Sequence, residues 1–290
     1  MTNAVAPPVL SLAGRSALVT GGGTGIGKAC ARALAAAGAR VTICGPDAAV
    51  LDAAFADLVA QGLPEAKAVT ADVTDEDQVA AAVDAAALGG ALDIAVANAG
   101  TAFPGSLLHI GAEHWMVPVG VNVLGTAHTI KHAARRMKEG GGSIITISSI
   151  ASTRPAAFMS TYSVSKAAVD ELTRVAAAEL GRFGIRVNGI RPGWMHTEAM
   201  ASSATEENLD LARRDTPIAP DTPLGGLGDP DHVARAVVYL AADYSSWVTG
   251  QLLGVCGGSS LPPPSGDFSH LARLLFPDEM ARDFDGPKVP

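Results

Sequence analysis

The stretch "TGGGTGIGKA", Thr20 to Ala29, decides the fold prediction because it joins an apolar run, "ALVT", to an Ala-rich segment of helical composition. Glycines in such a turn let the backbone approach a pyrophosphate, and the N-terminus of the following helix supplies amide donors and a partial positive charge. Glycines alone are weak evidence, since they also serve ordinary tight turns. Here they follow a strand and open a helix, which is the context that a dinucleotide site requires.

The same alternation of a short apolar run and a longer Ala-rich stretch continues from Ser16 to about Val255. This order indicates βαβ units and predicts one α/β domain with a doubly wound, seven-stranded parallel sheet in three αβα layers. Pro118 lies inside the fourth expected helix and should kink or shift it. Strands are expected at residues 17–20, 40–44, 68–72, 92–97, 143–148, 186–191 and 251–255. Helices are expected to begin near Gly25, Asp47, Asp75, Glu113, Ser160 and Asp229.

Three segments lie outside this alternation. Residues 1–11 form a lead segment before the domain of residues 12–258, and residues 195–228 read as a binding loop inside it. The C-terminal extension, residues 259–290, opens with the stiff, Pro-rich "SSLPPPSGDF" and continues as a short amphipathic helix in "SHLARLLFPDEMARDF". We expect this extension to dock on a neighbouring subunit near the active-site entrance.

Composition excludes several classes of protein. Hydrophobic residues make up 48% and charged residues 17%, which argues against disorder, and a net charge of −8 with scattered Lys and Arg argues against nucleic acid as a partner. Three cysteines without CxxC spacing indicate a reducing compartment and no structural zinc. The chain shows no secretory leader and no apolar run of about 20 residues, so we expect a soluble, cytoplasmic protein without a membrane partner. No metal site is expected, since His128 and His132 are spaced i, i+4 but lack an HExxH pattern.

The stretch "STYSVSKAAVDEL", Ser160 to Leu172, sets Tyr162 and Lys166 one helical turn apart on one face. Alone, such a pair is a Tyr at the edge of the core and a solvated Lys. Further motifs change this interpretation, because together with the pair the chain resembles the short-chain dehydrogenase/reductase superfamily from about Leu12 to Gly258. The motifs are "TGGGTGIG", "ADV" at 71–73, "NAG" at 98–100, "VNVLG" at 121–125, "ISS" ahead of "YSVSK", and "RPG" at 191–193.

The resemblance implies a single-domain Rossmann fold with a bound NAD or NADP. By the same resemblance, Asp72 and Val73 hold the adenine, Asn98 and Gly100 line the ribose, and Gly193 with Thr197 contacts the nicotinamide and pyrophosphate region. The full set of implied cofactor residues is Gly21, Gly23, Thr24, Gly25, Ile26, Gly27, Gly45, Pro46, Asp72, Val73, Asn98, Ala99, Gly100, Tyr162, Lys166, Pro192, Gly193 and Thr197.

The resemblance also implies four catalytic residues, Asn122, Ser149, Tyr162 and Lys166. Tyr162 would be the general acid/base of hydride transfer between a secondary alcohol and a ketone. Lys166 would bind the nicotinamide ribose, and its ammonium would lower the pKa of Tyr162. Ser149 would bind the substrate oxygen, while Ser148 should turn away because side chains alternate along a strand.

Asn122 would hold a water of a proton relay in this family; on its own it reads as a polar residue satisfying backbone groups near Pro118. Ser149 as a hydrolase nucleophile is disfavoured, because no GxSxG surrounds it.

Cofactor choice depends on the end of the second strand. Relatives often carry Asp at the position of Gly45 or Arg at that of Pro46, and this chain has neither. Thr24 is neutral and Asp47 is close, so NAD is slightly favoured over NADP.

The substrate pocket is expected to be mostly apolar, which suits a small hydrophobic alcohol or ketone. Its expected residues are Ser149, Ala151, Phe158, Trp194, Met195 and Met200.

Family members commonly assemble as tetramers through two helices and the last strand, so we expect a homotetramer, with a dimer as the alternative. Two other functions remain open. One is a catalytically silent dinucleotide-binding sensor or scaffold, and the other is an epimerase, dehydratase or enoyl reductase on a similar fold.

Overall fold

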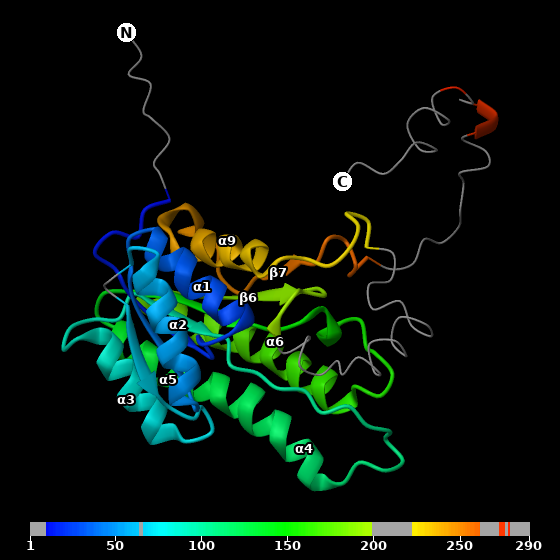
Figure 1. Cartoon of the computed structure of the whole chain (residues 1–290), viewed down its shortest axis with the longest axis horizontal. Helices are drawn as coiled ribbons and strands as arrows, with labels where there is room; N and C mark the ends of the chain where they lie inside the picture. The colour runs from blue at the N-terminus through cyan, green and yellow to red at the C-terminus, as the bar shows by residue number, and fades with distance from the viewer. Residues whose placement is uncertain (1–9, 64–65, 199–221, 262–272, 276–277, 279–290) are drawn as a thin grey trace. The chain divides into compact units, whose positions relative to one another are not determined.

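The computed structural model describes residues 10–63, 66–198, 222–261, 273–275 and 278. Residues 16–255 contain a seven-stranded sheet in the order β3-β2-β1-β4-β5-β6-β7, and every neighbouring pair is parallel (Figure 1). The predicted doubly wound parallel sheet is thereby confirmed. The strands are β1 (Ser16–Thr20), β2 (Arg40–Gly45), β3 (Lys67–Thr70), β4 (Ile94–Ala97), β5 (Gly142–Ile147), β6 (Ile185–Pro192) and β7 (Leu252–Val255).

Helices cover both faces of the sheet and give the predicted three layers. One face packs against α1, α2 and α9, and the other against α3, α5 and α6 (Figure 1). The central strands are therefore buried on both sides, which is why "SALVT" and "IAVA" read as nearly continuous apolar runs. The α-helices are α1 (Gly25–Ala36), α2 (Ala48–Ala60), α3 (Glu76–Ala87), α4 (Ala112–Pro118), α5 (Gly125–Met137), α6 (Ser160–Leu180) and α9 (Pro230–Ala241).

Aspartates begin three of these helices as the sequence predicts. Asp47 accepts the amides of Ala49 and Val50, Asp75 caps α3 in the same way, and Asp229 caps α9. Each cap satisfies amide donors that the first helical turn would otherwise leave without partners, and contributes about 1 kcal/mol.

Pro118 changes the fourth helix as expected. Because proline lacks an amide hydrogen, the α-helical hydrogen bonds cannot continue through it unaltered. The chain passes from α4 into a π-helical segment, η1 (Val119–Leu124), and only then into α5. Asn122 lies within this π-helical segment and is fully buried. The π-helical segment that follows Pro118 thus carries one of the predicted catalytic residues.

The chain divides into two compact units, residues 1–260 and 261–290. The lead segment, most of the loop at 195–228 and most of the extension lie outside the described residues, as does the expected docking of the extension on a neighbouring subunit. Of the predicted C-terminal helix, residues 273–275 and 278 are described, and they are helical. None of the helices in the described ranges is long and apolar enough to cross a membrane.

Candidate active site

The site forms where the strand order reverses, between β1 and β4, because helices leave the sheet in opposite directions there and open a crevice. The glycine turn after β1 fills one side of this crevice. Gly21 and Gly25 have φ values of 63° and 48°, a left-handed backbone that favours glycine. A Cβ on Gly27 would lie 2.0 Å from the carbonyl oxygen of Gly21, so α1 approaches the turn more closely than any side chain permits.

Asn98, at the end of β4, holds this turn in place. Its Nδ2 donates to the carbonyl oxygens of Thr20, at 2.9 Å, and Gly21, at 3.1 Å. In return, Thr20 Oγ1 accepts the amides of Asn98 and Ala99 at 3.0 and 3.1 Å. The "NAG" motif therefore locks the glycine turn to β4, a structural role beside the ribose contact that the resemblance implies.

The N-terminus of α1 already binds an anion of the protein itself. The Gly25 amide donates to Glu198 Oε2 at 2.8 Å, and a Cβ on Gly25 would lie 3.2 Å from Thr197 Cγ2. Within the described chain, Thr24 makes no side-chain cap bond to this helix. An amide-rich turn with left-handed glycines and a carboxylate bound to its first amide fits a pyrophosphate. Gly23 and Ile26 lie in the same turn.

The predicted adenine end lies beside the corner after β2. The Ala71 amide donates to the carbonyl oxygen of Gly45, which places the Asp72–Val73 turn next to Gly45 and Pro46. Asp72 Oδ1 accepts the amide and hydroxyl of Thr74, so β3 ends at Thr70 and Asp72 belongs to a turn, not to the strand predicted through residue 72.

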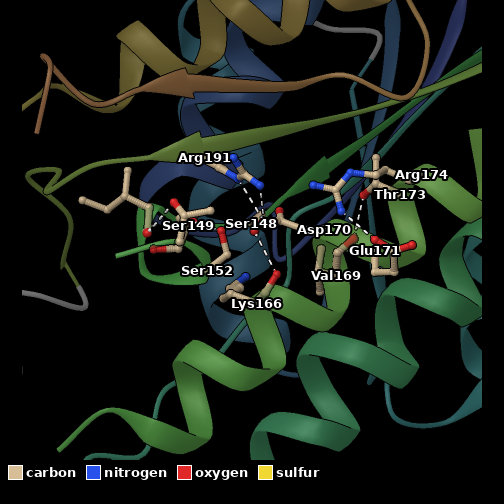
Figure 2. A network of polar contacts seen from close by, with 12 residues as sticks. Ser148, Ser149, Ser152, Lys166, Val169, Asp170, Glu171, Thr173, Arg174 and Arg191 are labelled. Carbon is tan, nitrogen blue, oxygen red and sulfur yellow. Dashed lines mark hydrogen bonds and ion pairs between the residues drawn. The ribbon is translucent and has the colours of Figure 1, made fainter. Parts of the chain in front are cut away.

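Tyr162, Ser149 and Lys166 meet at the carboxyl end of β5. Ser149 Oγ accepts the Ala151 amide at 3.1 Å, and its side chain acts on Tyr162 by lowering the pKa of the phenol. Lys166 Nζ donates to the carbonyl oxygen of Ile147 at 2.8 Å and lies 5.7 Å from the centroid of the Tyr162 ring. Ser148 turns away, as expected, and donates to the carbonyl oxygen of Lys166 at 3.1 Å (Figure 2). The predicted Ser, Tyr and Lys are thus assembled at one point.

The acid–base behaviour of this group differs from the expectation. Burial raises the pKa of Tyr162 above its ordinary value, and the hydrogen bond with Ser149 offsets only part of this rise. Lys166 is not among the groups that shift the pKa of Tyr162 here, and its ammonium donates to the carbonyl oxygen of Ile147. Burial lowers the pKa of Lys166 itself to about 8, against the opposing field of Asp170. With the protein groups alone, Tyr162 is a protonated acid at neutral pH.

Asn122 connects the π-helical segment to the catalytic helix. Its Oδ1 accepts the Thr101 amide at 2.8 Å, and its Nδ2 donates to the carbonyl oxygen of Thr101, at 2.9 Å, and to Ser165 Oγ, at 2.8 Å. Ser165 Oγ donates in turn to the carbonyl oxygen of Tyr162 at 2.8 Å. The side chain satisfies the backbone of Thr101, not groups near Pro118, and it positions the turn that carries Tyr162.

Lys166 also marks the cofactor side of the site. A Cβ on Gly100 would lie 3.2 Å from Lys166 Nζ and 3.4 Å from Asn122 Oδ1, so the third residue of "NAG" leaves space for the ammonium. Pro192 ends β6, and the Gly193 amide donates to the carbonyl oxygen of Val255 at 2.9 Å, which fixes the "RPG" turn against β7.

The expected substrate residues divide into two groups. Phe158 and Trp194 are exposed, by 67% and 43%, and Ala151 is half-buried beside Ser149, so these three can face a ligand. Met195 is buried and packs in the core with α1 and α9, next to Gly228, and its place in the substrate pocket stays a prediction. Met200 lies outside the described residues. Among the residues described, no cluster of His, Cys, Asp and Glu is arranged to hold a metal ion.

Comparison with known proteins identifies the family. The family model described as "Enoyl-(Acyl carrier protein) reductase", adh_short_C2, matches residues 21–260. Cis-4-hydroxycyclohexanecarboxylate dehydrogenase of Sinomonas cyclohexanicum is 42% identical over 86% of this chain and 97% of its own length. The chain is a short-chain dehydrogenase/reductase.

Other relatives of this short-chain dehydrogenase/reductase agree with that assignment. The 7alpha-hydroxysteroid dehydrogenase of Escherichia coli is 38% identical over 86% of this chain and 95% of its own length. A solved short-chain type dehydrogenase/reductase from Mycobacterium ulcerans superposes with a TM-score of 0.79 at 39% identity, covering 94% of this chain and 99% of its own. The protein is therefore an NAD(P)-dependent oxidoreductase that interconverts secondary alcohols and ketones.

Sequence reasoning did not identify Glu198, Ser165 or the pair formed by Asp170 and Arg191. The position of Asp170 could have been predicted from the sequence. It stands four residues after Lys166, the same spacing that places Tyr162 and Lys166 on one helical face. Glu198 carried none, because its bond to Gly25 joins residues 173 positions apart.

Proposed function

We propose that this short-chain dehydrogenase/reductase uses Tyr162 as its general acid/base, with Ser149, Lys166 and Asn122 as its partners. The observation that carries this proposal is the convergence of three side chains at the end of β5: Ser149 follows that strand, Lys166 Nζ bonds the carbonyl oxygen of its last residue, Ile147, and the Tyr162 ring lies 5.7 Å from Lys166 Nζ. In ketone reduction, the protonated phenol donates its proton to the substrate oxygen. In alcohol oxidation, the same oxygen accepts the proton of the alcohol.

The bound dinucleotide supplies or accepts the hydride. Ser149 orients the substrate oxygen towards Tyr162, and Lys166 offers a buried ammonium to the nicotinamide ribose. Asn122 holds the Thr101 backbone and, through Ser165, the turn of α6 that carries Tyr162. The glycine turn and the first amides of α1 take the pyrophosphate.

The preferred dinucleotide is NAD. Gly45 and Pro46 bring no cation to the corner after β2, and Asp47 caps α2 there with a carboxylate that would repel the extra phosphate of NADP. The site residues Asp72, Val73, Asn98, Ala99, Gly100, Pro192, Gly193 and Thr197 complete the proposed cofactor site.

The proposed substrate is an alicyclic secondary alcohol or the corresponding ketone. Phe158 and Trp194 present exposed apolar surface at the predicted pocket, which suits a hydrocarbon ring. Two relatives are dehydrogenases named for ring hydroxyl substrates, a hydroxycyclohexanecarboxylate and a hydroxysteroid. We further propose a cytoplasmic homotetramer.

The deciding experiment is an activity screen with NADH and NADPH separately on cyclic and acyclic ketones, on the matching alcohols, and on an enoyl thioester. We expect turnover of cyclic ketones with NADH, and loss of activity by about a thousandfold or more in Tyr162→Phe with cofactor binding retained. Tyr239→Phe is a control that removes a phenol oxygen elsewhere. Turnover that survives in Tyr162→Phe contradicts the mechanism, and turnover confined to the enoyl thioester identifies an enoyl reductase instead.

A further inference from the structure

Asp170 and Arg191 form a buried ion pair directly behind the catalytic residues. Arg191 donates to Asp170 Oδ2 through Nε, at 2.9 Å, and through Nη2, at 2.7 Å (Figure 2). The side chains are 5% and 19% exposed, so water screens this pair far less than a surface pair. Asp170 Oδ1 has no hydrogen-bond partner in the described part of the chain, so it is not neutralised by a second donor.

The pair is one of several attachments of α6 to the sheet, which also include the bond of Lys166 Nζ to the carbonyl oxygen of Ile147. Lys166 is held through its carbonyl oxygen by Ser148, Asp170 by Arg191, and Thr173 through its hydroxyl by Thr146 at 2.7 Å. The bonds made by Ser148 and Thr146 use neutral groups, so these two attachments need no buried carboxylate. Two buried charges are a costly way to join a helix to a strand, and they are weak evidence for stability alone.

The position of the carboxylate supplies a reason for the charge. Asp170 stands one helical turn after Lys166 on the same face, and its field acts on the Lys166 ammonium. Burial of that ammonium favours the neutral amine, which would weaken the charge-assisted hydrogen bond proposed between Lys166 and the nicotinamide ribose. We propose that Asp170 is a positioning residue for Lys166, with Arg191 orienting the carboxylate so that it keeps the Lys166 ammonium charged and in place. This proposal rests on the role proposed above for Lys166.

The other elements around Lys166 turn mostly neutral groups towards it. β5 offers the carbonyl oxygen of Ile147, residues 98–101 offer Gly100, and η1 offers the carboxamide of Asn122. On its own helix, the Tyr162 ring lies 5.7 Å away. Charged and titratable groups on the neighbouring helices pair with other residues. On α4, Glu113 pairs with His114. On α5, His128, Lys131 and His132 contact Glu76 of α3, and Arg136 pairs with Asp84 of α3.

The test is a titration of the Lys166 amine itself, followed by NMR in the full-length protein with 13C-labelled lysine. The chain has six lysines, and the Lys166 signal is identified by its loss in Lys166→Met. We expect a midpoint of about 8 in the wild type. Asp170→Asn should lower that midpoint by about one pH unit, and Arg191→Met should raise it, because the carboxylate then faces Lys166 alone.

Glu171→Gln is the matched control, because Glu171 is the next residue of α6 and pairs with Arg174 on the exposed side (Figure 2). Its midpoint should equal that of the wild type. If Asp170→Asn does not fold, Asp170→Asn combined with Arg191→Gln removes both charges and must still lower the midpoint. An unchanged midpoint without Asp170, or a fall in both Asp170→Asn and Arg191→Met, overturns the proposal in favour of a purely structural clamp.

Cofactor affinity provides a second readout. The dissociation constant for NADH should rise with pH as Lys166 loses its charge. In Asp170→Asn this rise should begin at a lower pH than in the wild type. The titration needs no turnover, so a result against Asp170 leaves the role of Tyr162 untouched, and activity in Tyr162→Phe leaves the titration standing.

Discussion

At the scale of single residues, Lys166 meets opposed physical demands. The role proposed for Lys166 requires a charged amine, while the surroundings of β5 and α6 exclude water and disfavour charge. Unfolding returns the pKa of Lys166 from about 8 to its ordinary 10.5. Between these values the unfolded chain binds more protons than the folded chain, so the Lys166 contribution to the free energy of unfolding rises with pH. Below pH 8 the full cost of the buried ammonium is present.

Lys166→Met should therefore stabilise the protein while abolishing activity. At neutral pH we expect a gain in the free energy of unfolding on the order of 2 kcal/mol, after the lost bond to Ile147 is subtracted. The gain should shrink as pH rises from 8 towards 10.5, which denaturant titrations at several pH values will measure. Lys138→Met, at an exposed lysine, should change neither value. A less stable Lys166→Met at neutral pH would contradict the burial cost.

Glu198 presents a second residue-scale prediction. Its carboxylate occupies the Gly25 amide that a dinucleotide pyrophosphate is proposed to take, so cofactor binding must displace it. Glu198→Gln should lower the dissociation constant for NADH by about threefold to tenfold, measured by nucleotide fluorescence, and the difference should shrink at high salt. Glu179→Gln, at an exposed position of α6, should bind as the wild type does. Weaker binding by Glu198→Gln would show that the carboxylate assists the cofactor instead.

At the scale of elements, local sequence signals predicted what local forces determine. Asp47, Asp75 and Asp229 mark helix starts because capping acts within three residues, and Pro118 marks the break in the fourth helix because it lacks a donor. The register of the π-helical segment was not predictable, since it depends on bonds from Asn122 to a distant residue, Thr101. The family resemblance predicted the remaining residues of the candidate site. It did not predict the ion pair of Asp170 and Arg191, whose partners lie 21 positions apart in the sequence.

Asn122 and Asn188 allow the effect of buried side-chain hydrogen bonds on stability to be distinguished from their effect on catalysis. Asn122 and Asn188 are both fully buried and both hold backbone groups of another segment. Replacing either by Ala should lower the free energy of unfolding by about 2–3 kcal/mol, because backbone partners lose their bonds. Only Asn122→Ala should also lower kcat, by roughly tenfold to a hundredfold, since its bond to Ser165 positions Tyr162. Equal kcat values in both folded variants would leave Asn122 a structural residue.

At the scale of the whole molecule, the sheet ends at β7, and apolar side chains gather near this edge. Tyr239 of α9, Tyr244, Trp247 and Leu253 of β7 are all exposed, and Trp247 is 99% exposed. An indole fully in water at a sheet edge is costly and favours an association surface. Tyr239 and Leu253 belong to the final helix and strand through which the resemblance implies assembly, and Tyr244 and Trp247 lie between them.

If the proposed homotetramer forms, light scattering coupled to size exclusion should give a solution mass near four times 29.3 kDa. Trp247→Glu should reduce this mass to about half, because a carboxylate would be buried without a partner at the contact. Val59→Glu places the same charge on an exposed apolar position of α2, 42% exposed and on a different helix, and should leave the mass unchanged. Combining Trp247→Glu with Leu253→Glu tests the edge twice. A tetramer that persists in this double variant would show that the interface lies elsewhere. A monomeric wild type would show that Trp247 does not contact another subunit.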